Sequence, residues 1–201
     1  MEKMHIQFTL FSAFYSPLIS TMSGGFLKDE GIDASYSVAP PGVSAIKALD
    51  AGEAQVIQSA PSQGFTSLAK GETPTAIHFA QINEMDGFFL TARNPDVAFD
   101  WKKLEGADVV MFGGGQPLAM FKYACHKAGI DFDKINAITP GGAADIDKAF
   151  RAGEGAYVQQ QGPFPQQLEA DGVGHVVAQV GPKIGPNAFS SLASTREWLA
   201  S

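Results

Sequence analysis

Cys125 and His126 are adjacent residues whose types suit nucleophilic catalysis, because a thiol nucleophile needs a neighbouring base. Leu118, Phe121 and Cys125 have the spacing of one face of a helix, which we expect over residues 117–128. That spacing places the Cys125 thiol in the protein core and points His126 elsewhere. We therefore expect no catalytic thiol and no enzyme activity.

The remaining histidines do not predict a metal site. His5, His78 and His175 all fall in predicted strands and share no spacing typical of metal ligands. The single cysteine excludes an internal disulfide and a cysteine-rich metal site. We expect neither a metal nor a cofactor.

Three glycines, Gly113, Gly114 and Gly115, follow a predicted strand and precede a helix that begins near Pro117. Backbone N–H groups at such a turn can hold an anion. The segment matches neither a P-loop nor a dinucleotide-binding fingerprint, so a nucleotide site is not expected. A tight turn from strand to helix is the alternative interpretation.

Aromatic and acidic residues stand near other predicted strand ends. Phe14 and Tyr15 can stack on a flat ligand, and burial in the core is the alternative for each. Glu84 and Asp86 flank Met85, where a carboxylate can meet an amino or cationic group of a ligand. A solvated position is the alternative for these two carboxylates.

The elements that position these residues occur twice in the chain. Residues 47–53 and 148–154 share the pattern K-A-x-x-A-G-E, and Gly-Ile-Asp occurs at both 31–33 and 129–131. Such ordered matches, about 100 residues apart, indicate an internal repeat.

Each half is predicted to alternate strands with helices, the order typical of parallel α/β sheets. A strand within 86–95 crosses between the halves, a strand over 187–192 returns, and Thr195 caps a last helix. We expect the other strands near 5–11, 34–39, 54–58, 74–80, 107–112, 135–139, 155–160 and 174–180, and the other helices near 17–29, 43–51, 62–70, 117–128, 143–152 and 163–171.

Ligands of such sheets bind beyond the carboxyl ends of the strands. The predicted loops there are rich in Ser, Gly, Pro, Gln and aromatic residues and contain no Lys or Arg. They can hold an anionic group through neutral donors, or a neutral or amino-bearing heterocycle by stacking. The candidate ligand-binding residues are Phe14, Tyr15, Ser16, Pro41, Gly42, Ser59, Ser62, Glu84, Gly113, Gly114, Gly115, Gln116, Gly141 and Gln160.

Composition excludes several classes of partner. The 201 residues carry 14 basic and 21 acidic side chains, a net charge of -7, which argues against nucleic acid and anionic membranes. No stretch reaches the roughly 18 to 20 apolar residues that span a bilayer, so we expect no membrane insertion. The chain opens on a predicted strand rather than a signal peptide.

Several segments carry a resemblance that covers essentially the whole chain, at residues 25–33, 48–56, 104–106, 128–131 and 150–154. The chain resembles the type II substrate-binding proteins of ABC importers. Within that class it is similar to the nitrate/sulfonate/taurine and thiamine-pyrimidine-precursor group.

The resemblance implies two Rossmann-like lobes, as in type II periplasmic-binding proteins, joined by a two-segment hinge. Lobe 1 would comprise residues 1–92 and 184–201, and lobe 2 residues 93–183. Relatives carry a longer C-terminal portion, so lobe 1 is expected to lack its last helices. The lobes would close on a small molecule.

The implied function is that of a monomeric solute-binding protein that delivers its ligand to the permease of an ABC transporter. The ligand would be a sulfonate, a nitrate-like anion, or a pyrimidine or other aromatic compound. An effector-sensing domain of a transcription regulator with the same two-lobe fold is the alternative. The expected location is periplasmic or extracytoplasmic if a signal peptide was removed, and cytoplasmic otherwise.

Overall fold

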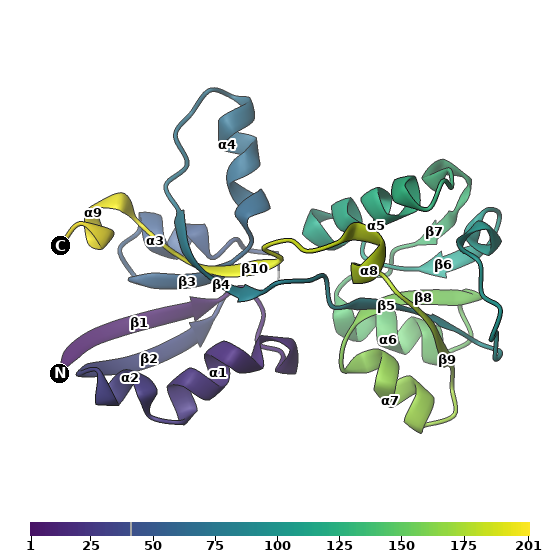
Figure 1. Cartoon of the computed structure of the whole chain (residues 1–201), viewed down its shortest axis with the longest axis horizontal. Helices are drawn as coiled ribbons and strands as arrows, with labels where there is room; N and C mark the ends of the chain where they lie inside the picture. Colours follow the sequence, from purple (N-terminus) through teal and green to yellow (C-terminus); the bar gives the residue numbers. More distant parts are fainter. Residues whose placement is uncertain (41) are drawn as a thin grey trace. The chain divides into compact units, whose positions relative to one another are not determined.

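Two structural units share the chain, and each is built on one five-stranded sheet (Figure 1). The computed structural model describes residues 1–40 and 42–201. Unit 1 comprises Met1–Glu84 and Ala188–Ser201, and unit 2 comprises Met85–Asn187. The predicted α/β class with two lobes is confirmed.

Unit 1 contains short helices between strands, at the places where the apolar periodicity and the glycines predicted them. Gly25, with a φ of 82°, interrupts the helix expected over 17–29 and divides it in two. The elements are β1 (Glu2–Phe8), η1 (Ala13–Tyr15), α1 (Ser16–Ser23), α2 (Phe26–Asp29), β2 (Ile32–Val38), α3 (Ile46–Asp50), β3 (Val56–Ser59), η2 (Pro61–Gly64), α4 (Phe65–Ala69), β4 (Ile77–Asn83), β10 (Ser190–Ser194) and α9 (Arg196–Leu199).

Unit 2 follows the same plan with a longer first helix. Its elements are β5 (Phe88–Ala92), η3 (Trp101–Leu104), β6 (Asp108–Val110), α5 (Gly115–Lys127), η4 (Phe132–Lys134), β7 (Asn136–Ile138), α6 (Ala143–Arg151), β8 (Tyr157–Gln161), α7 (Phe164–Ala170), β9 (His175–Gln179) and α8 (Gly181–Ile184).

The order of the strands confirms the internal repeat. It is β2-β1-β3-β10-β4 in unit 1 and β7-β6-β8-β5-β9 in unit 2. Ile6 of β1 lies opposite Val56 of β3, and Val109 of β6 lies opposite Tyr157 of β8. Each strand of unit 1 therefore has a counterpart in unit 2.

One strand in each sheet, β10 in unit 1 and β5 in unit 2, runs antiparallel to its neighbours, a feature that the expectation of parallel sheets did not include. The reason is where the chain enters each sheet. Ser190, which begins β10, lies opposite Asn83, which ends β4, and Phe88, which begins β5, lies opposite Gln161, which ends β8. Both strands start at the end where their neighbours finish.

The observed boundaries between the units differ from the expected ones. β5 pairs with β8 and β9, so the first boundary falls after Glu84 instead of after residue 92. The second falls after Asn187 instead of after residue 183.

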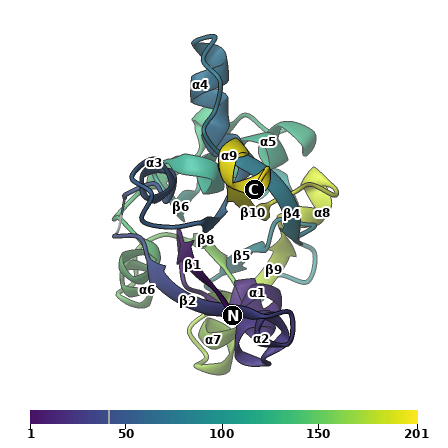
Figure 2. The same ribbon diagram turned by 90° about the vertical axis from the view of Figure 1, so that its left-hand side faces the viewer.

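Helices cover both faces of each sheet. In unit 1, α1 and α2 lie on one face and α3 and α4 on the other (Figure 1, Figure 2). In unit 2, α5 lies on one face and α6 and α7 on the other (Figure 1). Buried side chains such as Ile6, Ile57, Phe121 and Phe150 fill these interfaces. In the described part of the chain, no helix is long and apolar enough to cross a bilayer.

Candidate functional site: the carboxyl edges of the two sheets

We call the end of each sheet at which its parallel strands finish the carboxyl edge. In unit 1 this edge is organised by Gln58, which is 3 % exposed. Its Oε1 accepts hydrogen bonds from the backbone N–H groups of Thr9 (3.1 Å) and Leu10 (3.4 Å). Its Nε2 donates to Ser190 Oγ at 2.7 Å. Gln58 thus joins the ends of β1 and β3 to the start of β10.

The two aromatic residues predicted for stacking lie beside this edge in different environments. Tyr15 is buried at 6 % exposure in the core cluster beneath α1. Phe14 is half-buried, and its ring meets the Phe189 ring edge-on at 5.6 Å. Asn83 Nδ2 donates to the Phe14 carbonyl at 3.0 Å and so holds this turn. Of the two rings, Phe14 is the more accessible to a ligand.

Other predicted residues of unit 1 follow the strand ends. Ser16 is the exposed first residue of α1. Gly42 is exposed and has a φ of 75°. Ser62 lies in η2 and is half-buried. Glu84 is exposed at the end of the unit. Pro41 lies outside the described residues.

Ser59 is the predicted residue of unit 1 with a buried polar group that the fold leaves unbonded. It is 1 % exposed, and its Oγ has no hydrogen-bond partner in the described structure. In unit 2, Gln160 occupies the position that corresponds to Ser59. Val56 and Tyr157 are equivalent positions of the repeat, and Ser59 and Gln160 each lie three positions after one of them. Gln160 is also 1 % exposed, and both of its amide atoms lack a partner among the described residues. The repeat therefore places one unbonded polar side chain at the same point of each carboxyl edge.

Gly113, Gly114 and Gly115 form an exposed turn into α5, as predicted, and Gln116 follows within the helix. The first turn of α5 contains no acidic residue, and no side chain caps the helix at Gly114. A side chain at Gly113 would lie within 3.1 Å of Thr139 Cβ.

The N-terminus of α6 differs, because a carboxylate already occupies it. Asp145 Oδ2 accepts the Gly142 N–H at 3.0 Å. A β-carbon on the predicted site residue Gly141 would lie in contact with the same carboxylate. The negative charge of Asp145 disfavours an anion at this helix.

Asp86 stands at the carboxyl edge of unit 2, just before β5, and is 5 % exposed. Its Oδ1 accepts the Phe88 N–H at 2.7 Å, whereas its Oδ2 has no partner in the described structure. Burial raises the pKa of this carboxyl to about 6, and the hydrogen bond from Phe88 opposes that rise.

Charge is sparse at both edges. The described loops at the carboxyl edge of unit 1 contain no Lys or Arg, and those of unit 2 contain Lys183, which is exposed on α8. Neutral donors and acceptors therefore dominate these surfaces, which suits reversible binding of a small polar molecule.

Residues that could support catalysis are placed unfavourably for it. Cys125 is fully buried, and burial raises the pKa of its thiol to about 12, while His126 is exposed. Burial lowers the pKa of His78, whose Nδ1 lies 2.6 Å from Ser191 Oγ. No group of three or more His, Cys, Asp or Glu side chains within the described residues is arranged to hold a metal ion.

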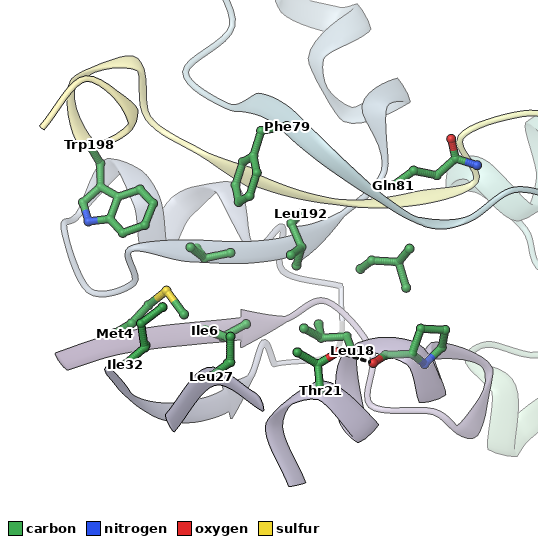
Figure 3. Close-up of a pocket in the computed structure, with 13 residues that line it drawn as sticks. Met4, Ile6, Leu18, Thr21, Leu27, Ile32, Phe79, Gln81, Leu192 and Trp198 are labelled. Carbon is green, nitrogen blue, oxygen red and sulfur yellow. Dashed lines mark hydrogen bonds between the residues drawn. The ribbon is translucent and has the colours of Figure 1, made fainter. Parts of the chain in front are cut away.

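A separate cavity of about 330 Å³ lies on the face of the unit 1 sheet that carries α1 and α2 (Figure 3). Its walls are mostly apolar, with Trp198 of α9 at one end. Thr21 Oγ1 donates to the Pro17 carbonyl at 2.7 Å, so this hydroxyl is already satisfied. We place the candidate site at the carboxyl edges because the polar groups of Ser59, Asp86 and Gln160 that lack a partner in the described structure lie at these edges and not in this cavity.

Sequence reasoning overlooked two of the polar residues at these edges. It selected Gln160 but neither Gln58 nor Gln159, and all three are buried. The internal repeat contains the signal that would have found them, because it aligns Gln58 with Gln159 at the ends of equivalent strands.

Comparison with known proteins identifies relatives of similar fold. A family model described as NMT1/THI5 like matches residues 14–162. YtlA of Bacillus subtilis (strain 168), named as a binding protein, is 30% identical over 201 residues, covering 99% of this chain and 60% of the relative. The chain thus spans about 60% of the length of that curated relative.

Two solved structures share the fold at low identity. The periplasmic aliphatic sulphonate binding protein SsuA from Escherichia coli matches with a TM-score of 0.80 and 16% identity, covering 100% of this chain and 67% of that one. The periplasmic nitrate-binding protein NrtA from Synechocystis PCC 6803 matches with a TM-score of 0.72 and 17% identity, covering 100% and 57%.

Proposed function

Because the chain belongs to the NMT1/THI5-like family, we propose that it captures a small solute for an ABC importer and has no catalytic activity of its own. The observation that carries the proposal is the pair Ser59 and Gln160. Each unit presents one buried polar side chain without a partner at the equivalent point of its carboxyl edge. Unbonded buried polar groups are rare in folded proteins, and a polar ligand would satisfy them.

The partners follow from the same proposal. The solute binds at a carboxyl edge, and the liganded protein is recognised by the permease of the importer. SsuA and NrtA are described as periplasmic, which supports an extracytoplasmic location for this chain. We propose that the chain acts as a monomer.

The ligand classes proposed are a sulfonate, a nitrate-like anion, or a pyrimidine or other aromatic compound. An anion would be held by the Ser59 and Ser62 hydroxyls and by the N–H groups of Gly113, Gly114 and Gly115. The half-buried Phe14 ring would support an aromatic ligand.

A thermal-shift screen with sulfonates, nitrate, pyrimidines and aromatic amides tests the proposal. A ligand at 100 times its Kd stabilises the folded protein by about 2.7 kcal/mol, which is readily measured. Silence across the whole panel would contradict solute binding.

Two variants test the location of the site. Ser59→Ala removes an unbonded hydroxyl, and Gly114→Val adds a side chain where no atom lies within 4 Å and the backbone is not left-handed. Both should fold normally and weaken the binding of any ligand found. Ser23→Ala, at the exposed end of α1, is the matched control. Unchanged affinity in both site variants would show that the site lies elsewhere.

A further inference from the structure

The apolar cavity of about 330 Å³ in unit 1 has no lining residue in common with the candidate site at the carboxyl edges (Figure 3). Its inner wall is formed by side chains of the buried core, among them Ile6 (1 % exposed), Leu18 (5 %) and Val56 (2 %). Phe79 of β4 also lines the cavity and is 46 % exposed, which places it at an opening to solvent. The cavity therefore combines a buried wall with an accessible mouth.

The walls of this cavity contain no partner for a charged group. Among the described residues that line it, Thr21 and Gln81 are polar and none is ionisable. The Thr21 hydroxyl already donates to the Pro17 carbonyl at 2.7 Å. Gln81 is exposed, and Figure 3 shows its amide at the opposite end of the cavity from Trp198. A charge buried between these walls would remain unpaired, so the cavity selects against ions.

Water is a poor occupant of the inner part of this cavity, because an ordered water molecule needs two to four polar partners. Apolar cavities in proteins stay dry, and one of about 150 Å³ binds benzene. The volume of about 330 Å³ in unit 1 is therefore sufficient for two fused aromatic rings. Burial of the apolar surface of such a molecule would supply the free energy of binding.

The corresponding face of the unit 2 sheet is covered by the chain itself. The helix α5, which is the counterpart of α1, packs against α8, and its buried Phe121 lies with its ring centroid 6.3 Å from that of Trp101. In the described part of unit 1, β4 ends at Asn83 and no helix follows it before the boundary. Trp198 follows β10 as Trp101 follows β5, but it is half-buried and lines the cavity. The internal repeat thus indicates a position for apolar groups that unit 1 leaves open.

The shape of the cavity favours a small molecule over a protein partner. A stable protein interface covers about 800 Å² on each partner. Among the described lining residues, Phe79 is the one large apolar side chain that is exposed. A concave space with so little exposed apolar surface at its mouth suits a molecule that enters it.

We propose that this cavity is a second binding site, and that it takes an uncharged aromatic molecule of up to two fused rings. The rings of Phe79 and Trp198, which line the cavity, favour an aromatic ligand. The inference goes beyond the proposed function, because it assigns a separate site in unit 1 to molecules that need no hydrogen bond from the protein.

Nitrobenzene and 1-nitronaphthalene serve as uncharged probes that quench tryptophan fluorescence, and 4-nitrobenzoate is the charged probe. The two tryptophans report separately, because Trp101→Phe retains Trp198 at the cavity and Trp198→Phe retains Trp101 of unit 2. The uncharged probes should quench Trp198 saturably, and 1-nitronaphthalene should bind about tenfold more tightly than nitrobenzene because its second ring buries more apolar surface. Trp101 should show collisional quenching alone.

The variant Thr21→Phe tests the location of the site, because its ring would fill part of the cavity. It should weaken the binding of 1-nitronaphthalene, measured by calorimetry, by about tenfold or more without lowering the melting temperature. Ser23→Phe, at an exposed position of the same helix outside the lining, is the matched control and should bind the probe like the parent. If Thr21→Phe fails to fold, the quenching of Trp198 decides, because the Trp101→Phe variant leaves the cavity unchanged.

Several results would overturn the inference. Absence of saturable quenching of Trp198 up to the solubility of the probes would show that the cavity binds no aromatic molecule. Equally tight binding of 4-nitrobenzoate would refute the class of ligand, and unchanged binding in Thr21→Phe would show that the probe binds elsewhere. A dimer in sedimentation that Thr21→Phe dissociates, without probe binding, would show that a second copy of the chain covers the cavity. Solute binding at the carboxyl edges is tested separately by the thermal-shift screen.

Discussion

Replacing Asp86 by asparagine should remove a pH dependence of folding stability that is built into unit 2. The asparagine Oδ1 can still accept the Phe88 N–H, which the carboxylate accepts at 2.7 Å. What changes is the buried second oxygen, Oδ2, which has no partner in the described structure and carries charge when the group ionises.

The magnitude follows from the pKa of the Asp86 carboxyl in the two states. Burial raises this pKa from 3.8 to about 6 in the folded protein. Between these values the folded state holds more protons than the unfolded state, so stability falls as the pH rises and the loss is complete above about pH 6. Two pKa units correspond to about 3 kcal/mol. The free energy of unfolding of Asp86→Asn, relative to the parent, should therefore rise by about 3 kcal/mol between about pH 3 and pH 7.

Urea unfolding followed by tryptophan fluorescence measures this difference. Trp101 is 8 % exposed in unit 2, whereas Trp198 belongs to unit 1. A Trp198→Phe background therefore makes the fluorescence report on unit 2, which matters because two units need not unfold together. Asp133→Asn, at an exposed carboxylate of the same unit, is the control.

A difference between Asp86→Asn and its parent that stays constant over this pH range would refute the reasoning. So would a difference that shrinks as the pH rises, because that sign requires a carboxylate stabilised in its charged form.

Three further results are expected in unit 2. Cys125 should resist iodoacetamide in the folded protein and react fully in urea, because burial raises the pKa of its thiol to about 12; rapid labelling without urea would contradict its placement. Gly181→Ala should destabilise unit 2 by about 1–3 kcal/mol in urea unfolding, because a β-carbon at this position meets the Asp86 carbonyl. Gly114→Ala, whose β-carbon meets no atom within 4 Å, should leave the stability unchanged. Equal effects of the two variants would argue against this packing. Arg93→Lys should lower the free energy of unfolding by about 2–4 kcal/mol. The Arg93 guanidinium donates to the Phe150 carbonyl at 2.7 Å and lies 4.1 Å from the centroid of the Phe150 ring. An unchanged urea midpoint would show that these contacts contribute nothing to stability.

The elements and their duplication could be predicted because their signals are local. Helices end at Gly52 and Gly153, whose φ values of 69° and 104° favour glycine over other residues. The matched K-A-x-x-A-G-E segments begin in α3 and α6 and lead toward β3 and β8. Periodicity and turn residues act over a few positions, so they survive without knowledge of the fold.

The positions of β10 between β3 and β4, and of β5 between β8 and β9, could not be predicted in the same way. Nothing within Phe88–Ala92 marks it as a strand that enters the second sheet between β8 and β9. Strand order is decided by hydrogen bonds between segments far apart in the chain, and the antiparallel direction follows from the edge at which each strand enters.

The candidate site shows the same division. The sequence by itself determined that Ser, Gly and Gln residues, with few charges, would follow the strand ends, and it located Ser59 and Gln160 among them. Only the tertiary structure decided which of these polar groups are already bonded. Thr9 and Ser190 satisfy Gln58, whereas both amide atoms of the equivalent Gln159 lack a partner in the described structure. A side chain carries its donors and acceptors in its own chemistry, but whether they remain free depends on neighbours that distant parts of the chain bring to it.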